Sequence, residues 1–417
     1  MRQLTVCAFL LLAYCVGRSQ DTVQHVQEGR RNSPAHLNSP YVILISIDGF
    51  RYDYADRYNA TNIIRLRNSG VQATSMIPSF PSVTFPNHYT IATGLYPSHH
   101  GLVYNQFYDR ERKATYNMSD RKAVEDGTWY GGTPLWVLAE KNGMLSASYH
   151  FVGSEAAIQQ TYPTYWYKYS EGKNIDFRIQ KLVDWLKLPE DRRPHLITFY
   201  MSEVDDAGHN FGPDTKQTGQ AVLYIDDVMR KLTARIDSLG LPVNYIFLAD
   251  HGMAQVDTVT RINIRAMIDT AQFIIRGGGT SLQLYAKNAQ SIQSTYDQLK
   301  AKEKDFIVYK REDIPRAWHF NKSDDSLNRI GDLFIVPVYP KVLSSWSGKI
   351  SPGAHGYDPV MKEMHATFYA WGPQIKKGRR INSFENIHVY PAVCRLLGLP
   401  VPTNIDGKKK VLRKIFK

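Results

Sequence analysis

Three short, largely apolar runs stand out along the chain, at residues 41–47, 195–202 and 244–249. They are rich in β-branched and aromatic residues and do not alternate between apolar and polar positions, which is typical of central strands in a parallel sheet covered by helices. Between the last two runs, residues 218–239 carry apolar side chains at helical spacing and end at Gly240. This βαβ pattern predicts a doubly wound α/β fold with a mostly parallel sheet and helices on both faces.

The pattern changes between about residues 265 and 345, where a Gly-Gly-Gly turn at 277–279 is followed by strand-like segments and a polar helical stretch. We expect a small inserted α+β subdomain there, within a catalytic domain that spans residues 40–403. The basic stretch at 404–417 is predicted to be a tail. Residues 21–39 are polar, which is typical of a linker.

The first twenty residues have the pattern of a secretory signal peptide. Their apolar run, residues 4–16, is shorter than the roughly 20 residues that span a bilayer, and Tyr14 before Cys15 disfavours a lipoprotein anchor. Without residues 1–20, Cys394 is the single cysteine left, so the exported chain would have no internal disulfide. We therefore expect an exported bacterial protein, periplasmic or secreted, with no transmembrane segment.

Composition and charge narrow the range of functions. The chain of 417 residues is 43% hydrophobic and 12% aromatic, so it can bury a large core and is not disordered. Its formal net charge of +12 is compatible with a nucleic-acid binder, a surface-associating protein or an enzyme for anionic substrates. Because no basic groove with a nucleic-acid-binding signature is evident in the sequence, binding of a nucleic-acid polymer is not expected.

Each of the three predicted strands runs into residues that commonly bind metals. Asp48 follows the first strand, Asp205 and His209 follow the second, and Asp250 and His251 follow the third. The carboxyl ends of parallel strands meet at one edge of a sheet, so these side chains should converge there. A further imidazole comes from the glycine-flanked His355, with His365 as its rival.

This set of three carboxylates and three imidazoles predicts a metal centre. Mixed oxygen and nitrogen ligands favour zinc over magnesium, which prefers an all-oxygen shell, and six ligands suit two ions that each keep an open position. Strand-end Asp and His residues can also be plain loop caps, but three ligand-rich strand ends make that interpretation weak.

A third element lies at residues 78–93, where Pro86 suits the first turn of a helix. Thr84 and the amide of Phe85 would then lie at a helix N-terminus, which favours a phosphoryl group. Thr84 taken alone could equally be an N-cap, and Asn105 alone could be a turn residue or an amide donor.

A resemblance to a known family runs in order through residues 41–373. It rests on Asp48-Gly-Phe-Arg51, Thr84-Phe-Pro-Asn-His-Tyr89, Thr93-Gly-Leu-Tyr-Pro97, the stretch from His100-Gly to Tyr108-Asp109, Asp205 with Gly208-His209, Asp250-His-Gly-Met253 and His355-Gly-Tyr-Asp358. These motifs resemble those of the ectonucleotide pyrophosphatase/phosphodiesterase family, which belongs to the alkaline phosphatase superfamily. We expect a bacterial-type member.

The resemblance implies two zinc ions and a nucleophilic threonine. Asp48, Asp250 and His251 would hold one ion, to which Thr84 binds as the nucleophile. Asp205, His209 and His355 would hold the second ion. Asn105 and the Phe85 amide would donate to a non-bridging phosphate oxygen.

The resemblance also implies a substrate. Phe85 and Tyr169, or alternatively Tyr167, would stack on a base, which contributes about 1–3 kcal/mol. The expected reaction is hydrolysis of nucleotide phosphodiester or pyrophosphate bonds to nucleoside 5′-monophosphates through a phosphothreonine intermediate. This fits a small-molecule nucleotide as the substrate.

Other activities of the superfamily stay open. A phosphomonoesterase would need extra cations around the terminal phosphate, for which Arg51, Lys341 and Lys349 are candidates. A phospholipid-type or phosphonate hydrolase is a weaker alternative, and a sulfatase is disfavoured because Thr84 and not Cys occupies the nucleophile position. The non-enzyme alternative is an inactive binding protein on the same fold, against which the intact ligand set argues.

Overall fold

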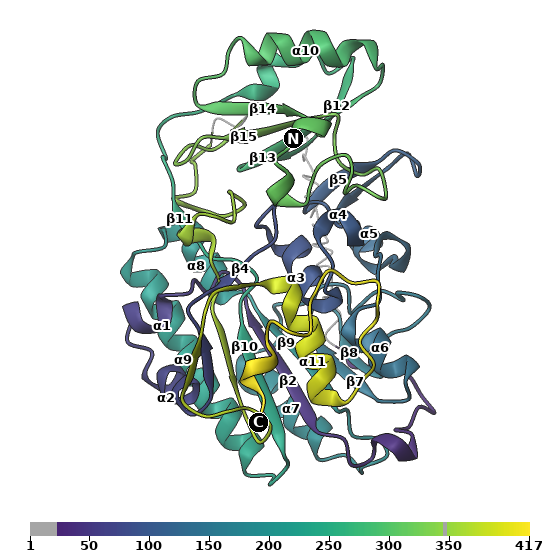
Figure 1. Ribbon diagram of the computed structural model, residues 1–417. Coiled ribbons are helices and arrows are strands. Elements are labelled where there is room, and N and C mark those ends of the chain that lie inside the picture. The colour runs from purple at the N-terminus through teal and green to yellow at the C-terminus, as the bar shows by residue number, and fades with distance from the viewer. Residues whose placement is uncertain (1–22, 345–347) are drawn as a thin grey trace, which may run out of the picture.

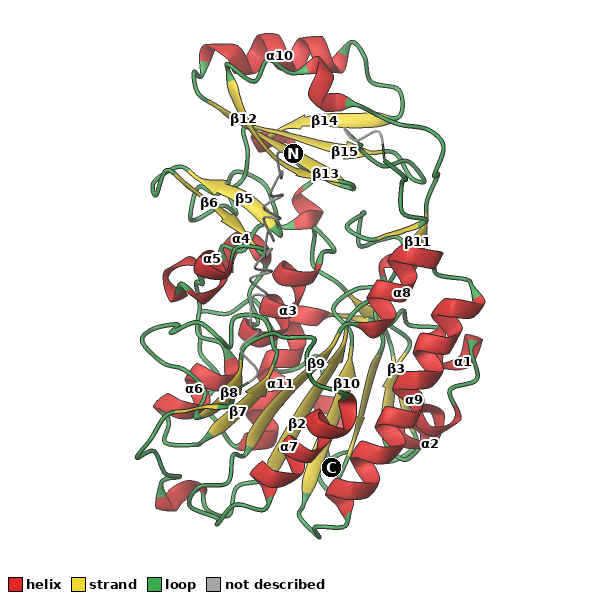
Figure 2. Cartoon of the chain, turned by 180° about the vertical axis from the view of Figure 1, so that it is seen from behind, coloured by secondary structure: helices red, strands yellow, loops and turns green. Residues whose placement is uncertain are grey.

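The computed structural model describes residues 23–344 and 348–417, and a nine-stranded sheet forms its centre (Figures 1 and 2). The strands lie in the order β1 (His25–Val26), β8 (Tyr165–Tyr167), β7 (Ser146–Tyr149), β9 (Leu196–Met201), β2 (Tyr41–Ile47), β10 (Val243–Leu248), β17 (Phe368–Trp371), β3 (Val71–Ala73) and β18 (Arg379–Ile381). The five strands from β8 to β10 run parallel, while β17 pairs antiparallel with β10 and β3. The prediction of a mostly parallel sheet is confirmed.

The three apolar runs become β9, β2 and β10, which are neighbours at the centre of the sheet. Every residue of these strands is buried, because helices cover both faces and leave no polar side. Ile45 pairs with Phe199 on one side and with Phe247 on the other. Their carboxyl ends therefore lie side by side at one edge of the sheet.

Two groups of helices cover the sheet, with α3 and α11 on one face and α7 and α9 on the other (Figures 1 and 2). The described α-helices are α1 (Tyr54–Arg57), α2 (Thr61–Asn68), α3 (Thr84–Thr93), α4 (Pro97–His100), α5 (Arg121–Glu125), α6 (Leu135–Lys141), α7 (Ile175–Leu186), α8 (Glu203–Phe211), α9 (Lys216–Asp237), α10 (Gln290–Lys300) and α11 (Val389–Leu397). The helix predicted at 218–239 corresponds to α9, which Thr215 caps by accepting a hydrogen bond from the Thr218 amide.

A second, four-stranded antiparallel sheet stands beyond the carboxyl edge of the main sheet (Figure 2). It consists of β12 (Phe273–Gly278), β13 (Ser281–Ala286), β15 (Leu333–Pro337) and β14 (Phe306–Lys310), with α10 packed on it around its own apolar core. The remaining short strands pair as β5 (Gln106–Asp109) with β6 (Ala114–Asn117), β4 (Met76–Ile77) with β19 (Phe384–Glu385), and β11 (Ala254–Gln255) with β16 (Gly353–Ala354).

Both segments expected to lie outside the domain are packed against it. In the predicted linker, β1 pairs with β8, and the Asn32 side chain donates to the carbonyls of Glu190 and Arg193 at 2.9 and 2.8 Å. In the predicted tail, Ile415 is fully buried and its carbonyl accepts from the Lys376 amide at 2.8 Å. The prediction gave too much weight to polar composition, because a few buried side chains suffice to anchor each segment.

The predicted signal peptide at 1–20 lies outside the described residues. Within the ranges described, none of the helices combines the length and the apolar character that a membrane span requires.

Candidate active site

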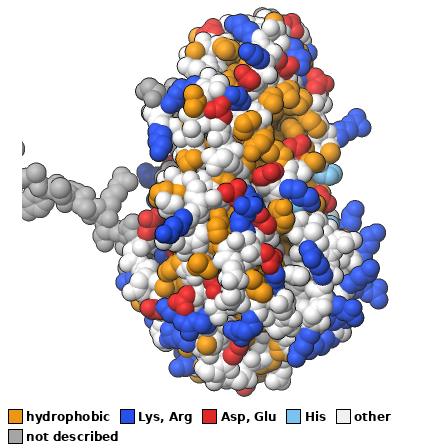
Figure 3. All heavy atoms as spheres, turned by 90° about the vertical axis from the view of Figure 1, so that its left-hand side faces the viewer, with side chains coloured by type: hydrophobic (Ala, Val, Ile, Leu, Met, Phe, Trp, Pro, Cys, Tyr) orange, Lys and Arg blue, Asp and Glu red, His pale blue; other side chains and the backbone are white. Residues whose placement is uncertain are grey.

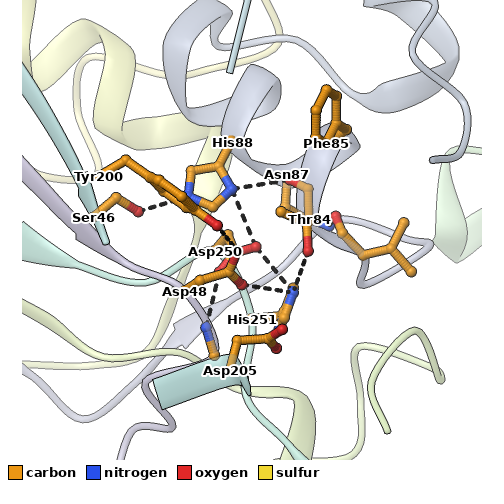
Figure 4. A network of polar contacts seen from close by, with 12 residues as sticks. Ser46, Asp48, Thr84, Phe85, Asn87, His88, Tyr200, Asp205, Asp250 and His251 are labelled. Carbon is orange, nitrogen blue, oxygen red and sulfur yellow. Dashed lines mark hydrogen bonds and ion pairs between the residues drawn. The ribbon is translucent and has the colours of Figure 1, made fainter. Parts of the chain in front are cut away.

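The candidate ligand residues that follow the three central strands come together at the carboxyl edge of the sheet (Figure 4). Asp48 follows β2, Asp250 and His251 follow β10, and Asp205 lies in the first turn of α8. The Nε2 atom of His251 is 3.3 Å from Asp48 Oδ1 and 3.0 Å from Asp250 Oδ2. All of these side chains except the partly buried Asp205 are almost fully shielded from solvent.

The predicted second set of ligands lies beside the first. The Oδ1 atom of Asp205 lies 3.7 Å from His355 Nε2, and its Oδ2 atom lies 3.5 Å from His209 Nε2. The His355 ring stacks on His251 at a centroid distance of 3.6 Å and lies 4.9 Å from the His209 ring. His365 is bonded elsewhere, to the Ser75 hydroxyl and the Pro359 carbonyl, so of the two rival histidines His355 is the one at the cluster.

Two overlapping groups in the described chain have the arrangement that holds a metal ion. Asp48, Asp250 and His251 form one and Asp205, His251 and His355 form the other, with ligand atoms within 4.8 Å of one another in each group. His251 belongs to both groups, whereas the family resemblance assigned it to the first alone. His209 borders the second group without belonging to it.

The electrostatics of this cluster also suit a bound cation. Burial, together with the carboxylate of Asp250, raises the pKa of Asp48 well above its usual range, and burial raises the pKa of Asp205 to about 7. Although burial opposes it, the Asp250 carboxylate raises the pKa of His251 to about 10. Within the described chain, the Oδ1 atoms of Asp48 and Asp205 accept no hydrogen bond. Buried carboxylates are stable only when paired or bound to a metal, so this donor set fits divalent cations.

Thr84 faces the cluster from the first residue of α3. The N-cap is Val83 and no side chain caps the helix, so the alternative of Thr84 as an N-cap is wrong. Its Oγ1 atom lies 3.2 Å from His251 Nε2, and the next amide, that of Phe85, donates to Asn105 Oδ1 at 3.0 Å. A hydroxyl, a helix N-terminus and an amide side chain thus surround one point beside the carboxylates.

Gly49 lets the first two strand ends approach each other. Its φ is +66°, and a Cβ at this position would lie 2.9 Å from Asp205 Oδ1 and 3.0 Å from Asp205 Cα. Its amide also faces Asp250 Oδ1 at 3.3 Å. Only glycine allows both this backbone conformation and so close an approach of position 49 to Asp205. The Asp48-Gly49 turn therefore brings the carboxylates of Asp48 and Asp205 together.

A cleft of about 380 Å³ opens beside Thr84. Phe85 and Tyr169 both line it, and Tyr169 is 41% exposed. Tyr167, the alternative stacking residue, is 3% exposed and packs against Trp185 and Phe177 in the core. Tyr169 is therefore the one of the two tyrosines placed at the cleft.

Several cleft residues escaped the sequence analysis. Arg121 and Glu155 form a two-pronged ion pair at 2.9 and 2.5 Å, and Glu155 Oε2 also accepts from the Tyr169 amide at 3.0 Å. Met118 and His150 complete this part of the lining. These residues come from separate segments, and no spacing in the sequence links them to Thr84.

The turn of the inserted sheet touches both sides of the site. Tyr104, which precedes Asn105, donates its hydroxyl to the Gly278 carbonyl at 3.0 Å. Thr280 donates its hydroxyl to the His355 carbonyl at 2.9 Å. The inserted sheet is therefore hydrogen-bonded to the segments that carry Asn105 and His355.

This architecture defines a class of protein. A mostly parallel α/β sheet that carries overlapping carboxylate and imidazole clusters at its carboxyl edge, facing a threonine at a helix N-terminus, places the chain in the alkaline phosphatase superfamily. Residues 42–358 match the family model described as type I phosphodiesterase/nucleotide pyrophosphatase. The chain belongs to this family, as its motifs predicted.

The curated relatives that this chain resembles include animal proteins. The chain is 32% identical over 388 residues to mouse ectonucleotide pyrophosphatase/phosphodiesterase family member 1 and 33% identical over 391 residues to venom phosphodiesterase 2 of Crotalus adamanteus. These alignments cover 89% and 90% of this chain but 42% and 48% of the relatives. The chain thus spans less than half the length of these curated relatives.

Solved structures of a relative share this fold over most of the chain. Murine ectonucleotide pyrophosphatase/phosphodiesterase 5 superimposes with a TM-score of 0.84 at 27% identity, covering 90% of this chain and 100% of that one. A second structure of the murine protein, an inactive threonine-to-alanine variant in complex with AMP, has the same TM-score of 0.84 and covers 91% of this chain.

Proposed function

We propose that this chain hydrolyses phosphodiester or pyrophosphate bonds of nucleotides and releases nucleoside 5′-monophosphates. The observation that carries the proposal is the position of Thr84, whose hydroxyl lies 3.2 Å from His251 Nε2 at the mouth of a cleft lined by Phe85 and Tyr169. The family supports the reaction class, and the murine structure with AMP supports the nucleotide.

Two zinc ions suit the donor set. Asp48, Asp250 and His251 would hold one ion together with Thr84, and Asp205, His209 and His355 would hold the other. Mixed carboxylate and imidazole ligands favour zinc. When bound, the two ions supply Lewis-acid stabilisation of phosphate charge and lower the pKa of a coordinated hydroxyl or water.

The chain's own residues account for the bond changes. The Thr84 hydroxyl gives up its proton and its oxygen attacks phosphorus. The bond to the leaving group breaks, that group departs with the bonding electrons and takes up a proton, and a phosphothreonine results. Water then gives up a proton and attacks the same phosphorus, the bond to Thr84 breaks, and the Thr84 oxygen takes up a proton, which restores the hydroxyl as the nucleoside monophosphate leaves. The α3 N-terminus stabilises the negative charge on the phosphoryl group in both steps. The Phe85 amide gives up its hydrogen bond to Asn105 Oδ1 and donates to a phosphoryl oxygen instead.

The cleft and the local charges favour a diester over a monoester. Phe85 and Tyr169 offer aromatic surface to a base, whereas Arg51 and Lys341, candidate cations for a terminal phosphate, pair with Asp53 and Asp257. On the face drawn in Figure 3, acidic and basic side chains are mixed over the middle of the molecule, and basic ones gather along its lower right-hand edge.

We also propose that the chain is exported, on the basis of the signal-like sequence at 1–20. A bacterial origin with a periplasmic or secreted location stays a prediction from the cysteine usage.

The test uses the zinc-loaded protein and three esters: bis(p-nitrophenyl) phosphate, p-nitrophenyl phosphate and thymidine 5′-monophosphate p-nitrophenyl ester. We expect the nucleotide ester to give the highest kcat/KM and the monoester the lowest. Thr84→Ala should abolish turnover of all three, while the exposed Thr74→Ala serves as a matched control. Full activity of Thr84→Ala would overturn the mechanism, and a preference for the monoester would overturn the substrate class.

A further inference from the structure

His88 connects the proposed nucleophile to the ligand carboxylates, although neither its sequence position nor the family comparison assigns it a role. It lies on α3, one helical turn after Thr84, and is fully buried (Figure 4). Its Nδ1 atom lies 3.0 Å from the Thr84 carbonyl and 3.2 Å from Asp250 Oδ2. On the other side of the ring, Nε2 contacts the Ser46 hydroxyl of β2 at 2.9 Å.

The partners of Nδ1 determine which nitrogen carries the proton. Both of its neighbours, the Thr84 carbonyl and the Asp250 carboxylate, are acceptors, so Nδ1 must be protonated and donate toward them. The Ser46 hydroxyl satisfies Nε2 in either role, since a hydroxyl can donate or accept. In this orientation both ring nitrogens of His88 have a partner.

Packing removes the remaining freedom of the ring. Tyr200 and Phe151 contact it edge to face, at centroid distances of 5.1 and 5.4 Å. Tyr200 in turn donates its hydroxyl to Asp48 Oδ2 at 2.6 Å. The same group of side chains thus touches Asp48, Asp250 and the first residue of α3.

We propose that His88 is a positioning residue that fixes Asp250 and the Thr84 end of α3 relative to each other. It contacts neither the cleft nor the Thr84 hydroxyl, so it acts through these two residues. Partners behind metal ligands orient them, and their loss lowers metal affinity or activity about 10- to 100-fold. The inference rests on the proposed metal-dependent function.

Two substitutions separate the contacts of the ring. His88→Asn keeps a hydrogen-bond donor near the position of Nδ1, because the Asn amide nitrogen is as many bonds from the backbone as Nδ1 is. His88→Gln places its amide near the position of Nε2 and leaves no hydrogen-bond donor at the position of Nδ1. The matched control is His100→Gln, because His100 is equally buried and bonded to Thr90 at 3.0 Å but touches no site carboxylate.

The measurements are zinc affinity, by competition with a chelating dye, together with kcat, KM and the unfolding midpoint. We expect His88→Gln to lose about 10- to 100-fold in zinc affinity and to lower kcat more than KM, and His88→Asn to stay within about threefold of the wild type. His100→Gln should lower the unfolding midpoint and leave zinc affinity unchanged.

Three results would overturn the inference. They are wild-type zinc affinity and kcat in His88→Gln, a folded His88→Asn that loses more than about tenfold in both quantities, and an equal loss of zinc affinity in His88→Gln and His100→Gln. If His88→Gln does not fold, the comparison of His88→Asn with the wild type decides. A wild-type protein that binds zinc but cleaves none of the three esters would overturn the proposed activity alone, since zinc affinity is measured without turnover.

Discussion

Replacing Tyr169 by alanine tests the aromatic wall of the cleft. The ring is 41% exposed and already contacts His150 and Tyr200, at centroid distances of 5.2 and 6.2 Å. The ring is thus partly covered, and its exposed part is available to a base. Stacking contributes about 1–3 kcal/mol per base. Because the ring is only partly exposed, we expect the lower part of this range, about 1–2 kcal/mol, which corresponds to a roughly 5- to 30-fold loss in kcat/KM.

The assay compares the thymidine p-nitrophenyl ester with bis(p-nitrophenyl) phosphate, which has no base. Tyr169→Ala should lower kcat/KM for the nucleotide ester and leave the simple diester unchanged. Tyr224→Ala, an equally exposed tyrosine on α9, is the matched control and should affect neither substrate. Tyr167→Ala should instead destabilise the fold by about 3–5 kcal/mol, because it empties a core position. Equal losses on both substrates in Tyr169→Ala would refute base stacking.

Three further predictions follow from the geometry. His355→Asn should lower zinc affinity and His365→Asn should not, which titration against a chelating dye measures; equal losses would contradict the ligand assignment. Thr280→Val should lower kcat and zinc affinity while Thr280→Ser retains both, since only the hydroxyl donates to the His355 carbonyl; identical values in the two variants would exclude a positioning role. Burial lowers the pKa of His100 to about 3 from an ordinary 6.5, so the unfolded chain takes up a proton that the folded chain does not. The free energy of unfolding should therefore fall as the pH drops from about 6.5 toward 3, by at most about 1.4 kcal/mol per pH unit from this group. Denaturant unfolding at several pH values should show a shallower dependence in His100→Gln, and an unchanged slope would show that the histidine does not contribute.

Much of the fold was predictable because the central strands are buried on both faces. Continuous apolar runs mark β2, β9 and β10, and the helical spacing of α9 joins two of them into one unit. Peripheral strands gave no such signal. The strand β1 has two residues, too few for any periodicity, and its pairing with β8 depends on contacts between segments far apart in the sequence.

The candidate site also has a part that the sequence predicts and a part that it does not. The convergence of the Asp and His residues at the strand ends could be predicted, because parallel strands bring their carboxyl ends to one edge. The orientation of side chains within segments could not, so neither the Arg121–Glu155 pair nor the sharing of His251 between two clusters was foreseen. His88 had one sequence signal, its spacing of one helical turn from Thr84, but its contacts with Ser46 and Asp250 come from two other strands.

The Asp48-Gly49 turn has a consequence for classifying related chains. Any side chain at position 49 would occupy the space that Asp205 fills, so a substitution there would disrupt the cluster even if every ligand and the threonine were retained. A glycine at this position is therefore a criterion for catalytic competence that is separate from the ligands themselves. Among divergent copies with an intact ligand set, those with a bulkier residue at this position are the first candidates for pseudoenzymes.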